Sequence, residues 1–283
     1  MDLVNTIKER LLHYSWDIGF GIFNERLIEN GLKKTDYVVV KNPYKSKWFA
    51  DPFILEDTTT ELVLLVEEFD KNIKRGRIAR LTIDKKQKLI VECNIVLDLP
   101  THLSFPAIYE IDGILYVNPE NSQSGSNYIY RYDKEKNLFV ERRQTINRPL
   151  ADAIIFFHKN RYIMYATENP SPNGNILYIF ESHNIMGPYH EVGKEVLSSN
   201  IARMAGHIIC VKNGILRPAQ DCNGAYGKAV LFVDNGKVVG CIRPQTIKYA
   251  GVHTFNKKGN VFVIDLKRYD YPYLYWLKEK IKK

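Results

Sequence analysis

The chain lacks several features that would assign it to particular classes of protein. It has no uninterrupted run of about 18 apolar residues, so the sequence predicts no membrane-spanning helix. Its first residues, MDLVNTIKERLLHYSW, carry charges throughout. They show neither the apolar stretch nor the small-residue cleavage site of a signal peptide. We therefore expect a cytoplasmic protein.

Cysteine is also scarce, with four residues in 283: Cys93, Cys210, Cys222 and Cys241. None lies within metal-ligand spacing of another, so the sequence predicts no zinc site. The even count would permit two disulfides, but nothing resembles a small, disulfide-dense secreted domain. We expect four free thiols, no metal site and no cofactor.

Charge of one sign does not dominate, although the formal net charge is +8. The 40 basic residues are interspersed with 32 acidic ones. The excess suggests an anionic partner, which could be a nucleic acid, a membrane surface or a phosphate-bearing substrate. The lysines are scattered and no nucleic-acid-binding motif accompanies them, so we expect no nucleic acid partner.

Three segments are expected along the chain. Residues 1–36 form an N-terminal helical extension, because apolar residues recur at helical spacing over residues 2–15. Residues 37–270 read as short β-strands separated by turns. Residues 271–283 form a basic, aromatic C-terminal helix. Aromatics beside lysines suit peripheral contact with the inner face of a membrane, whereas docking on the protein body is the alternative.

An internal repeat organises the β-rich segment. The units begin 47 to 55 residues apart, at Trp48, Leu103, Leu150, Arg203 and Gly251. Each passes from a small or polar opening into an apolar strand, a turn and a second strand, and most contain two further strands. Four strands at this period are typical of propeller blades. The sequence therefore predicts an all-β, five-bladed β-propeller.

A β-sandwich is the alternative fold, but it gives no reason for polar residues at one fixed phase of every repeat. The last repeat is short of strands at its carboxyl end. Residues 36–40, DYVVV, could complete that blade and close the ring.

Polar residues near the blade openings should converge, because the first strand of each blade lines the central channel. Polar groups there are costly unless they are wet or paired. The candidates contributed by successive repeats are Asp51; His102, Ser104 and Glu120; Asp152 and Glu168; Arg203, Arg217, Gln220, Asp221 and Tyr226; and His253.

Asp51 stands in the motif FADPFIL, where the proline lacks a backbone donor. At this point the chain resembles glycoside hydrolase family 43, five-bladed propellers whose first blade carries a catalytic base in an Asp-Pro motif. A closer resemblance spans nearly the whole propeller. The segments HLSFP, PENS, LADAIIF, RPAQDC, AYG and GVHT resemble the N-terminal domain of glucosamine inositolphosphorylceramide transferases, whose bacterial relatives are found among surface-polysaccharide genes.

The resemblance to family 43 implies a general base, a second aspartate that tunes its pKa, and a glutamic general acid. Asp51 matches the base, and Asp152 has the repeat phase of the second aspartate. The family's glutamate motif is not recognisable, so Glu120 and Glu168 are candidates for the acid by position only. This departure favours transfer over hydrolysis.

Chemistry favours transfer for a second reason. Hydrolysis needs a protonated carboxylic acid beside the leaving oxygen, whereas a phosphate leaving group needs a cation. The predicted cations fit the latter, although Arg203 and Arg217 could equally be structural ties between blades. His102 and His253 could instead bond the backbone, Gln220 and Asp221 could form a turn, and Tyr226 could pack between blades.

The leading hypothesis is an inverting glycosyltransferase of surface-polysaccharide biosynthesis. Its partners would be a nucleotide-sugar or other phosphate-activated donor and a glycan or lipid-linked glycan acceptor. The alternatives are a family 43-like glycoside hydrolase and a non-catalytic carbohydrate-binding propeller.

Overall fold

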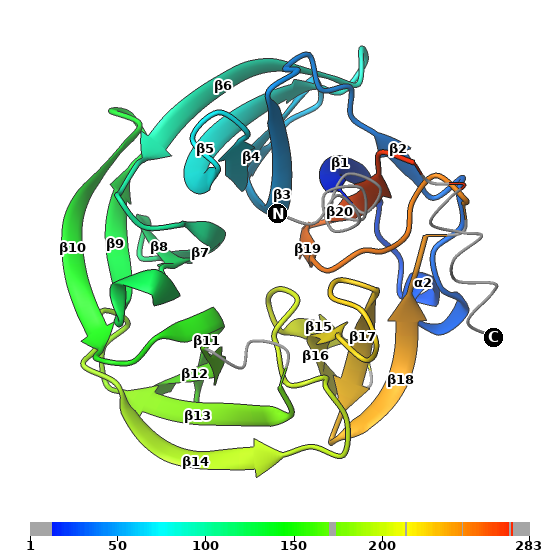
Figure 1. Ribbon diagram of the computed structural model, residues 1–283. Coiled ribbons are helices and arrows are strands. Elements are labelled where there is room, and N and C mark those ends of the chain that lie inside the picture. Colours follow the sequence, from blue (N-terminus) through cyan, green and yellow to red (C-terminus); the bar gives the residue numbers. More distant parts are fainter. Residues whose placement is uncertain (1–12, 170–173, 213, 245, 272, 274–283) are drawn as a thin grey trace, which may run out of the picture.

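The computed structural model describes residues 13–169, 174–212, 214–244, 246–271 and 273. Five four-stranded antiparallel sheets follow one another around a ring, which confirms the predicted five-bladed propeller (Figure 1). In each blade the first strand of the repeat lies nearest the ring centre and the fourth lies at the rim. The centre therefore receives side chains from every blade.

The first three blades follow the repeat directly. Blade 1 comprises β3 (Lys47–Asp57), β4 (Glu61–Asp70), β5 (Arg75–Asp84) and β6 (Leu89–Leu97). Blade 2 comprises β7 (Ser104–Ile111), β8 (Ile114–Glu120), β9 (Asn127–Asp133) and β10 (Leu138–Ile146), with a 3₁₀ turn, η1 (Ser122–Ser124), after β8. Blade 3 comprises β11 (Leu150–His158), β12 (Arg161–Glu168), β13 (Ile176–Ser182) and β14 (His190–Val196).

The remaining two blades include the one in which the ring closes. Blade 4 comprises β15 (Ile209–Val211), β16 (Gly214–Asp221), β17 (Ala229–Asp234) and β18 (Lys237–Ile242). Blade 5 combines β19 (Phe255–Lys258) and β20 (Val261–Tyr269) with β1 (Tyr14–Ile22) and β2 (Tyr37–Val39). Residues from the two ends of the chain thus share one sheet and close the ring (Figure 1).

The closure corrects the expected boundary of the propeller at residue 37. Residues 36–40 do supply a strand to the last blade, but β1 also belongs to it and pairs along its whole length with β20. Residues 14 and 15 were expected in a helix, but they begin strand β1. Their side chains point to opposite faces of a buried sheet, as neighbouring side chains in a strand do. The rest of the expected N-terminal helix, residues 1–12, lies outside the described residues, as does nearly all of the C-terminal helix.

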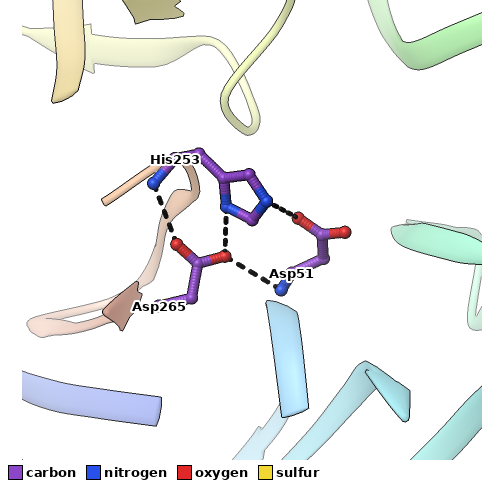
Figure 2. Close-up of side chains that lie close together, drawn as sticks. All are labelled: Asp51, His253 and Asp265. Carbon is purple, nitrogen blue, oxygen red and sulfur yellow. Dashed lines mark hydrogen bonds and ion pairs between the residues drawn. The ribbon is translucent and has the colours of Figure 1, made fainter. Parts of the chain in front are cut away.

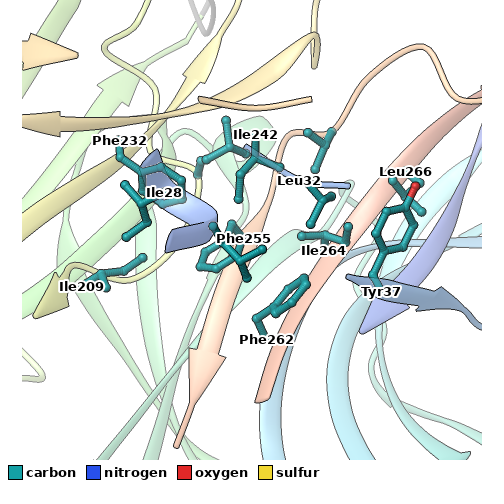
Figure 3. Close-up of a cluster of buried hydrophobic side chains, with 14 of the residues drawn as sticks. Ile28, Leu32, Tyr37, Ile209, Phe232, Ile242, Phe255, Phe262, Ile264 and Leu266 are labelled. Carbon is teal, nitrogen blue, oxygen red and sulfur yellow. The ribbon is translucent and has the colours of Figure 1, made fainter. Parts of the chain in front are cut away.

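A hydrophobic cluster fills the seam between blades 4 and 5 (Figure 3). The short helix α2 (Arg26–Asn30) follows β1 and inserts Ile28 beside Phe232 of β17 and Ile242 of β18. Phe255 and Ile264 meet them from blade 5. Apolar burial of this kind stabilises by about 25 cal/mol per Å². The seam therefore keeps the first strand of the chain attached to the last repeat.

All four cysteines are free, as predicted. No helix among the described residues is long and apolar enough to cross a membrane.

The closure strand leaves no room for a side chain at Gly21. A Cβ there would lie 2.1 Å from the main-chain oxygen of Asp36 and 2.7 Å from the ring of Phe262. Gly21→Ala should therefore lower the free energy of unfolding by about 1–3 kcal/mol, as overpacking does. Denaturant titration measures the change. Gly19→Ala is the matched control, since its Cβ would meet only side chains, at 3.2 Å and beyond, and should cost less than about 1 kcal/mol. Equal losses in the two variants would contradict this account.

Candidate functional site

A β-bulge near the start of the first strand recurs in three blades. The strand pairing shifts around Asp51 in β3, Phe105 in β7 and Asp152 in β11, and all three residues have φ between 45° and 50°. A residue in a bulge makes no ladder hydrogen bond, so the prolines at positions 52 and 106 cost nothing there. Left-handed backbone is unusual outside glycine and often accompanies functional sites. The bulges set two aspartates and one backbone N–H near the ring centre.

Asp51 joins three blades. Its Oδ1 accepts a hydrogen bond of 2.6 Å from the Thr254 hydroxyl, and its Oδ2 accepts one of 3.2 Å from the Phe105 N–H. Its own N–H donates to Asp265 Oδ2 over 3.0 Å. The carboxylate is 4% exposed, so protein donors replace nearly all of its contact with water.

His253 bridges two carboxylates, as Figure 2 shows. Its Nδ1 lies 2.6 Å from Asp265 Oδ2, and its Nε2 lies 3.7 Å from Asp51 Oδ1. Asp265 also accepts the backbone N–H groups of His253 and Thr254. The pKa of His253 is raised by the two aspartates despite burial, whereas that of Asp265 is lowered by His253. The group can therefore share a proton between His253 and Asp51.

A second carboxylate group lies beside the first. Arg203 donates from Nε and Nη2 to the two oxygens of Asp152, over 2.5 and 3.3 Å, and from Nη2 to Glu120 over 3.4 Å. Gln220 donates to Asp152 over 2.5 Å. Glu120 also accepts hydrogen bonds from Ser104 and Ser122, over 3.5 and 2.8 Å. Among the described residues no partner contacts Nη1 of Arg203, so that group can still donate to a ligand.

Aromatic rings cover both groups. Tyr226 lies above the Arg203 guanidinium, with 5.3 Å to the ring centroid, and contacts His253 edge-on. Trp16 of β1 stacks on His253 at 4.0 Å. Gly227 makes this approach possible, because a Cβ there would lie 2.7 Å from Trp16. Lys267 donates to the Tyr226 carbonyl oxygen over 2.9 Å, and burial lowers its pKa to about 8.

His102 lies at the border of these groups. Its Nε2 is 3.3 Å from Glu67 Oε1, and its side chain is one-third exposed. The pKa of His102 is raised by Glu67, Glu120 and Asp51, which together outweigh the effect of burial. It is the most accessible titratable side chain that interacts with Asp51.

Burial raises the pKa of both central aspartates to about 7. For Asp51 the nearby His253 opposes this rise, while Asp152 and Asp265 add to it. For Asp152 the ion pair with Arg203 opposes it, while Glu120 adds to it. A carboxyl group with a pKa near neutrality can accept or donate a proton under ordinary conditions.

Three of these residues could also ligate a cation. Ligand atoms of Asp51, His253 and Asp265 all lie within 4.8 Å of one another. However, His253 Nδ1 is already engaged with Asp265, and both oxygens of Asp51 accept hydrogen bonds. A metal ion would have to replace these contacts, so the set as built suits proton sharing better. The expected absence of metal and cofactor stays a prediction.

Three predicted site residues lie elsewhere. Glu168 pairs with Arg148, at 2.7 Å. Arg217 donates to the carbonyl oxygens of residues 201 and 202, and Asp221 pairs with Lys228 and Arg243 and caps a turn at Asn223. These three are structural contacts, the alternative that the sequence left open for Arg217 and Asp221. The other nine candidates belong to the central groups or border them.

Strand register explains the difference between the two candidate glutamates. Glu120 of β8 lies opposite Ser104, one residue before the bulge, as Glu67 lies opposite Ala50 in blade 1. Glu168 lies opposite Leu150, two residues before the bulge. Because side chains alternate along a strand, one position points to the centre and the next points away.

Four side chains of the site were not among the twelve candidates: Trp16, Thr254, Asp265 and Lys267. Trp16 lies in the segment expected to precede the propeller, so its place depended on recognising β1 as a blade strand. Lys267 follows Asp265 by two residues on β20 and therefore shares its face. That spacing was a usable signal for Lys267.

The fold and the central groups define a five-bladed propeller with buried aspartates, a histidine and an arginine at the ring centre. Residues 34–239 match the sequence model of the family described as "Glucosamine inositolphosphorylceramide transferase 1, N-terminal". The chain belongs to this family, which confirms the resemblance seen in its motifs.

Two plant proteins that carry the family's name are similar in sequence to this chain. Glucosamine inositolphosphorylceramide transferase 1 of Oryza sativa subsp. japonica is 26% identical over 194 residues, which cover 66% of this chain and 26% of that protein. The Arabidopsis thaliana protein of the same name is 26% identical over 193 residues, which cover 65% and 25%. The chain spans about a quarter of the length of these relatives.

Solved structures of glycoside hydrolases share the fold. A family 43 β-1,3-galactosidase superposes with a TM-score of 0.55 at 12% identity, covering 75% of this chain and 52% of that one. The catalytic domain of the Coprinopsis cinerea family 62 α-L-arabinofuranosidase gives 0.55 at 7% identity, covering 90% and 98%. At these identities the likeness shows the fold alone.

The raised pKa of Asp51 predicts a pH-dependent cost in stability. Between the ordinary aspartate pKa and about 7, the folded protein holds a proton that the unfolded chain has released. The free energy of unfolding therefore falls as pH rises through this window. Asp51→Asn removes the ionisation, so its melting temperature relative to wild type should be higher at pH 8 than at pH 5, by about 5 °C. Calorimetry at the two pH values measures this.

Asp84→Asn is the control for that measurement. The Gln87 N–H lowers the pKa of the exposed Asp84 carboxyl, so Asp84 is ionised in both folded and unfolded chains from pH 5 upward. Its melting-temperature difference from wild type should be the same at both pH values. An Asp51→Asn difference that is equally independent of pH would show that Asp51 is ionised throughout.

Proposed function

We propose that the protein is an enzyme that transfers a sugar from a phosphate-activated donor to a hydroxyl group of a glycan acceptor, with inversion. One observation supports the proposal: Asp51, a buried carboxyl group with a pKa of about 7, interacts electrostatically with Asp152, and Asp152 binds Arg203, whose Nη1 makes no hydrogen bond among the described residues. The family name and the carbohydrate-active fold support a sugar substrate. The match covers only about a quarter of each relative, so their activity is not carried over directly.

Asp51 would act as the general base. It would take the proton of the acceptor hydroxyl as the hydroxyl oxygen attacks the anomeric carbon from the face opposite the leaving phosphate. His253, at 3.7 Å, would stabilise the charge on Asp51 and is itself held in orientation by Asp265. The hydrogen bonds from Thr254 and Phe105 fix the carboxylate against rotation.

Arg203 would act on the donor. Its Nε and Nη2 are held by Asp152 and Glu120, so the remaining Nη1 is oriented without further loss of side-chain freedom. A fixed guanidinium donor near the developing phosphate charge would stabilise the transition state. Tyr226, over the guanidinium, is placed to stack on the sugar ring.

Glycoside hydrolysis is the second candidate, and Asp152 favours it. Burial and the neighbouring Glu120 raise the pKa of Asp152 to about 7, so Asp152 can hold a proton at neutral pH. A retained proton is what a general acid needs. However, Asp152 is also bonded to Arg203, whose charge favours the ionised form of that carboxyl group.

The first kinetic prediction concerns the base. Asp51→Asn should lower kcat by about 10²–10⁴-fold with nucleotide-sugar donors, because the amide cannot accept the proton. Wild-type kcat/KM should rise with pH and level off above about 7, where Asp51 is ionised. Release of nucleoside diphosphate from a panel of nucleotide sugars measures both. Glu168→Gln, which removes a carboxylate outside the cluster, is the matched control and should keep wild-type rates.

The same assay separates the alternatives. A hydrolase would cleave aryl glycosides and show no dependence on a donor phosphate. A binding propeller would show ligand-dependent stabilisation without turnover. Full activity in Asp51→Asn would exclude Asp51 as the base.

The second kinetic prediction concerns Arg203. Alanine would leave Asp152 buried and unpaired, at a cost of about 3–5 kcal/mol in stability, so Arg203→Lys is the informative change. Lysine keeps the charge beside Asp152 but cannot present the third nitrogen of the guanidinium fork. We expect KM for the donor to rise about tenfold and kcat to fall, since the contact exists in the ground state and strengthens as charge develops on the leaving phosphate. Steady-state kinetics at varied donor and fixed acceptor tests this, and unchanged donor KM would contradict it.

A further inference from the structure

A basic groove lies outside the central cluster, along the connection between β2 and β3. It has a volume of about 630 Å³. Its lining includes strand residues of blades 5 and 1 and the residues that join them. They are Ser15, Asp17, Val39, Val40, Lys41, Asn42, Tyr44, Lys45, Lys47, Trp48, Lys71, Lys248 and Arg268.

The groove carries six cationic side chains and one carboxylate, Asp17. Two of the cations are already matched: Lys47 lies 2.7 Å from Glu68, and Arg268 lies 3.1 Å from Asp17. Lys41, Lys45, Lys71 and Lys248 are exposed, and among the described residues no carboxylate lies within ion-pair distance of them. Four like charges held together without counter-charges repel one another, and an anion would relieve that repulsion.

Backbone contacts hold the lysines in place. The main chain of Lys41 hydrogen-bonds with that of Lys88 and Ile90, at β6. The Asn42 side chain accepts the Tyr44 N–H and donates to the Lys47 carbonyl oxygen, which fixes the turn between them. The Lys71 N–H donates to the Ser46 carbonyl oxygen over 2.9 Å. Hydrogen bonds therefore fix the backbone positions of these lysines, so the basic groove is part of the folded structure.

Aromatic side chains lie among the cations. Trp48 stacks on Phe69 at 4.6 Å and is half-buried, and Tyr44 lies 5.8 Å from the Lys47 ammonium. These rings make part of the wall apolar and fix its shape. Lysine ammonium groups around such a wall suit a compact, multiply charged anion, and a phosphate or pyrophosphate group has that charge and size.

We propose that this groove binds the phosphate or pyrophosphate group of a ligand. The ligand can be a lipid that carries phosphate in its headgroup or a soluble phosphorylated molecule, since both present the same chemistry to the lysines. The site is separate from the central cluster: Ser15 and Asp17 of β1 line the groove, whereas Trp16 between them faces His253. The proposal does not depend on the reaction at the ring centre, because its test measures binding alone.

The test neutralises three of the four unmatched lysines together in the full chain, as Lys41→Gln, Lys45→Gln and Lys71→Gln. Binding of inorganic pyrophosphate is measured by calorimetry, and binding to phosphatidylcholine vesicles with and without phosphatidylglycerol by sedimentation. Each lysine near an anionic surface contributes roughly fivefold, so the triple variant should weaken binding about a hundredfold. Wild-type binding should also weaken with added salt.

The matched control removes the same charge elsewhere, as Lys159→Gln, Lys194→Gln and Lys237→Gln. These side chains are exposed on blades 3 and 4, and no ion pair engages them in the described part of the chain. If the groove variant loses pyrophosphate binding but keeps vesicle binding, the result supports a soluble ligand. If it loses vesicle binding but keeps pyrophosphate binding, the result supports a lipid. Equal behaviour of the two triple variants toward both probes, or no binding of either probe by the wild type, would overturn the proposal.

Discussion

The ring is held at its centre by two buried aspartates that each bond across blades. Asp51 in blade 1 accepts hydrogen bonds from Thr254 in blade 5 and Phe105 in blade 2. Asp152 in blade 3 binds Arg203 and Gln220 of blade 4, and Arg203 in turn reaches Glu120 of blade 2. Every blade therefore has a side chain or backbone group in this network. Apolar seams such as that in Figure 3 hold neighbouring blades together, but the aspartates fix how the blade openings face one another.

A centre of this kind carries a cost in the free energy of folding. Both aspartates have left-handed backbone, and both lose nearly all hydration of a charged group. An apolar centre of the same volume would be at least as stable. The gain is in preorganisation, because a carboxylate held by fixed donors need not reorganise when charge moves during a reaction. The strain and burial at Asp51 and Asp152 thus accompany both the contacts between blades and the fixed donors around each carboxyl group.

The sequence predicted the fold and most of the site for one reason: polar residues recur at a fixed position, or phase, of the repeat. Any residue at the phase of Asp51 lies on the innermost strand near the axis, so Asp152 could be matched to it without knowing a contact. The phase of the repeat predicts less about the direction of side chains on the second strand of a blade. Gln220 and Asp221 are adjacent, yet Gln220 binds Asp152 while Asp221 binds Lys228. Which of two neighbours points inward depends on the strand register, and the phase of the repeat alone does not fix that register.

Trp16 escaped prediction for a different reason, and its position shows what ring closure does for function. A strand drawn from the start of the chain completes the last blade, so residues 251 places apart, Trp16 and Lys267, become cross-strand neighbours. One side of β1 then covers His253, while Ser15 and Asp17 line the basic groove. Ring closure therefore stabilises the fold and also builds the wall between two chemically different sites. A change in the pairing of β1 would disturb both sites together, since alternate residues of the same three-residue stretch line the two sites.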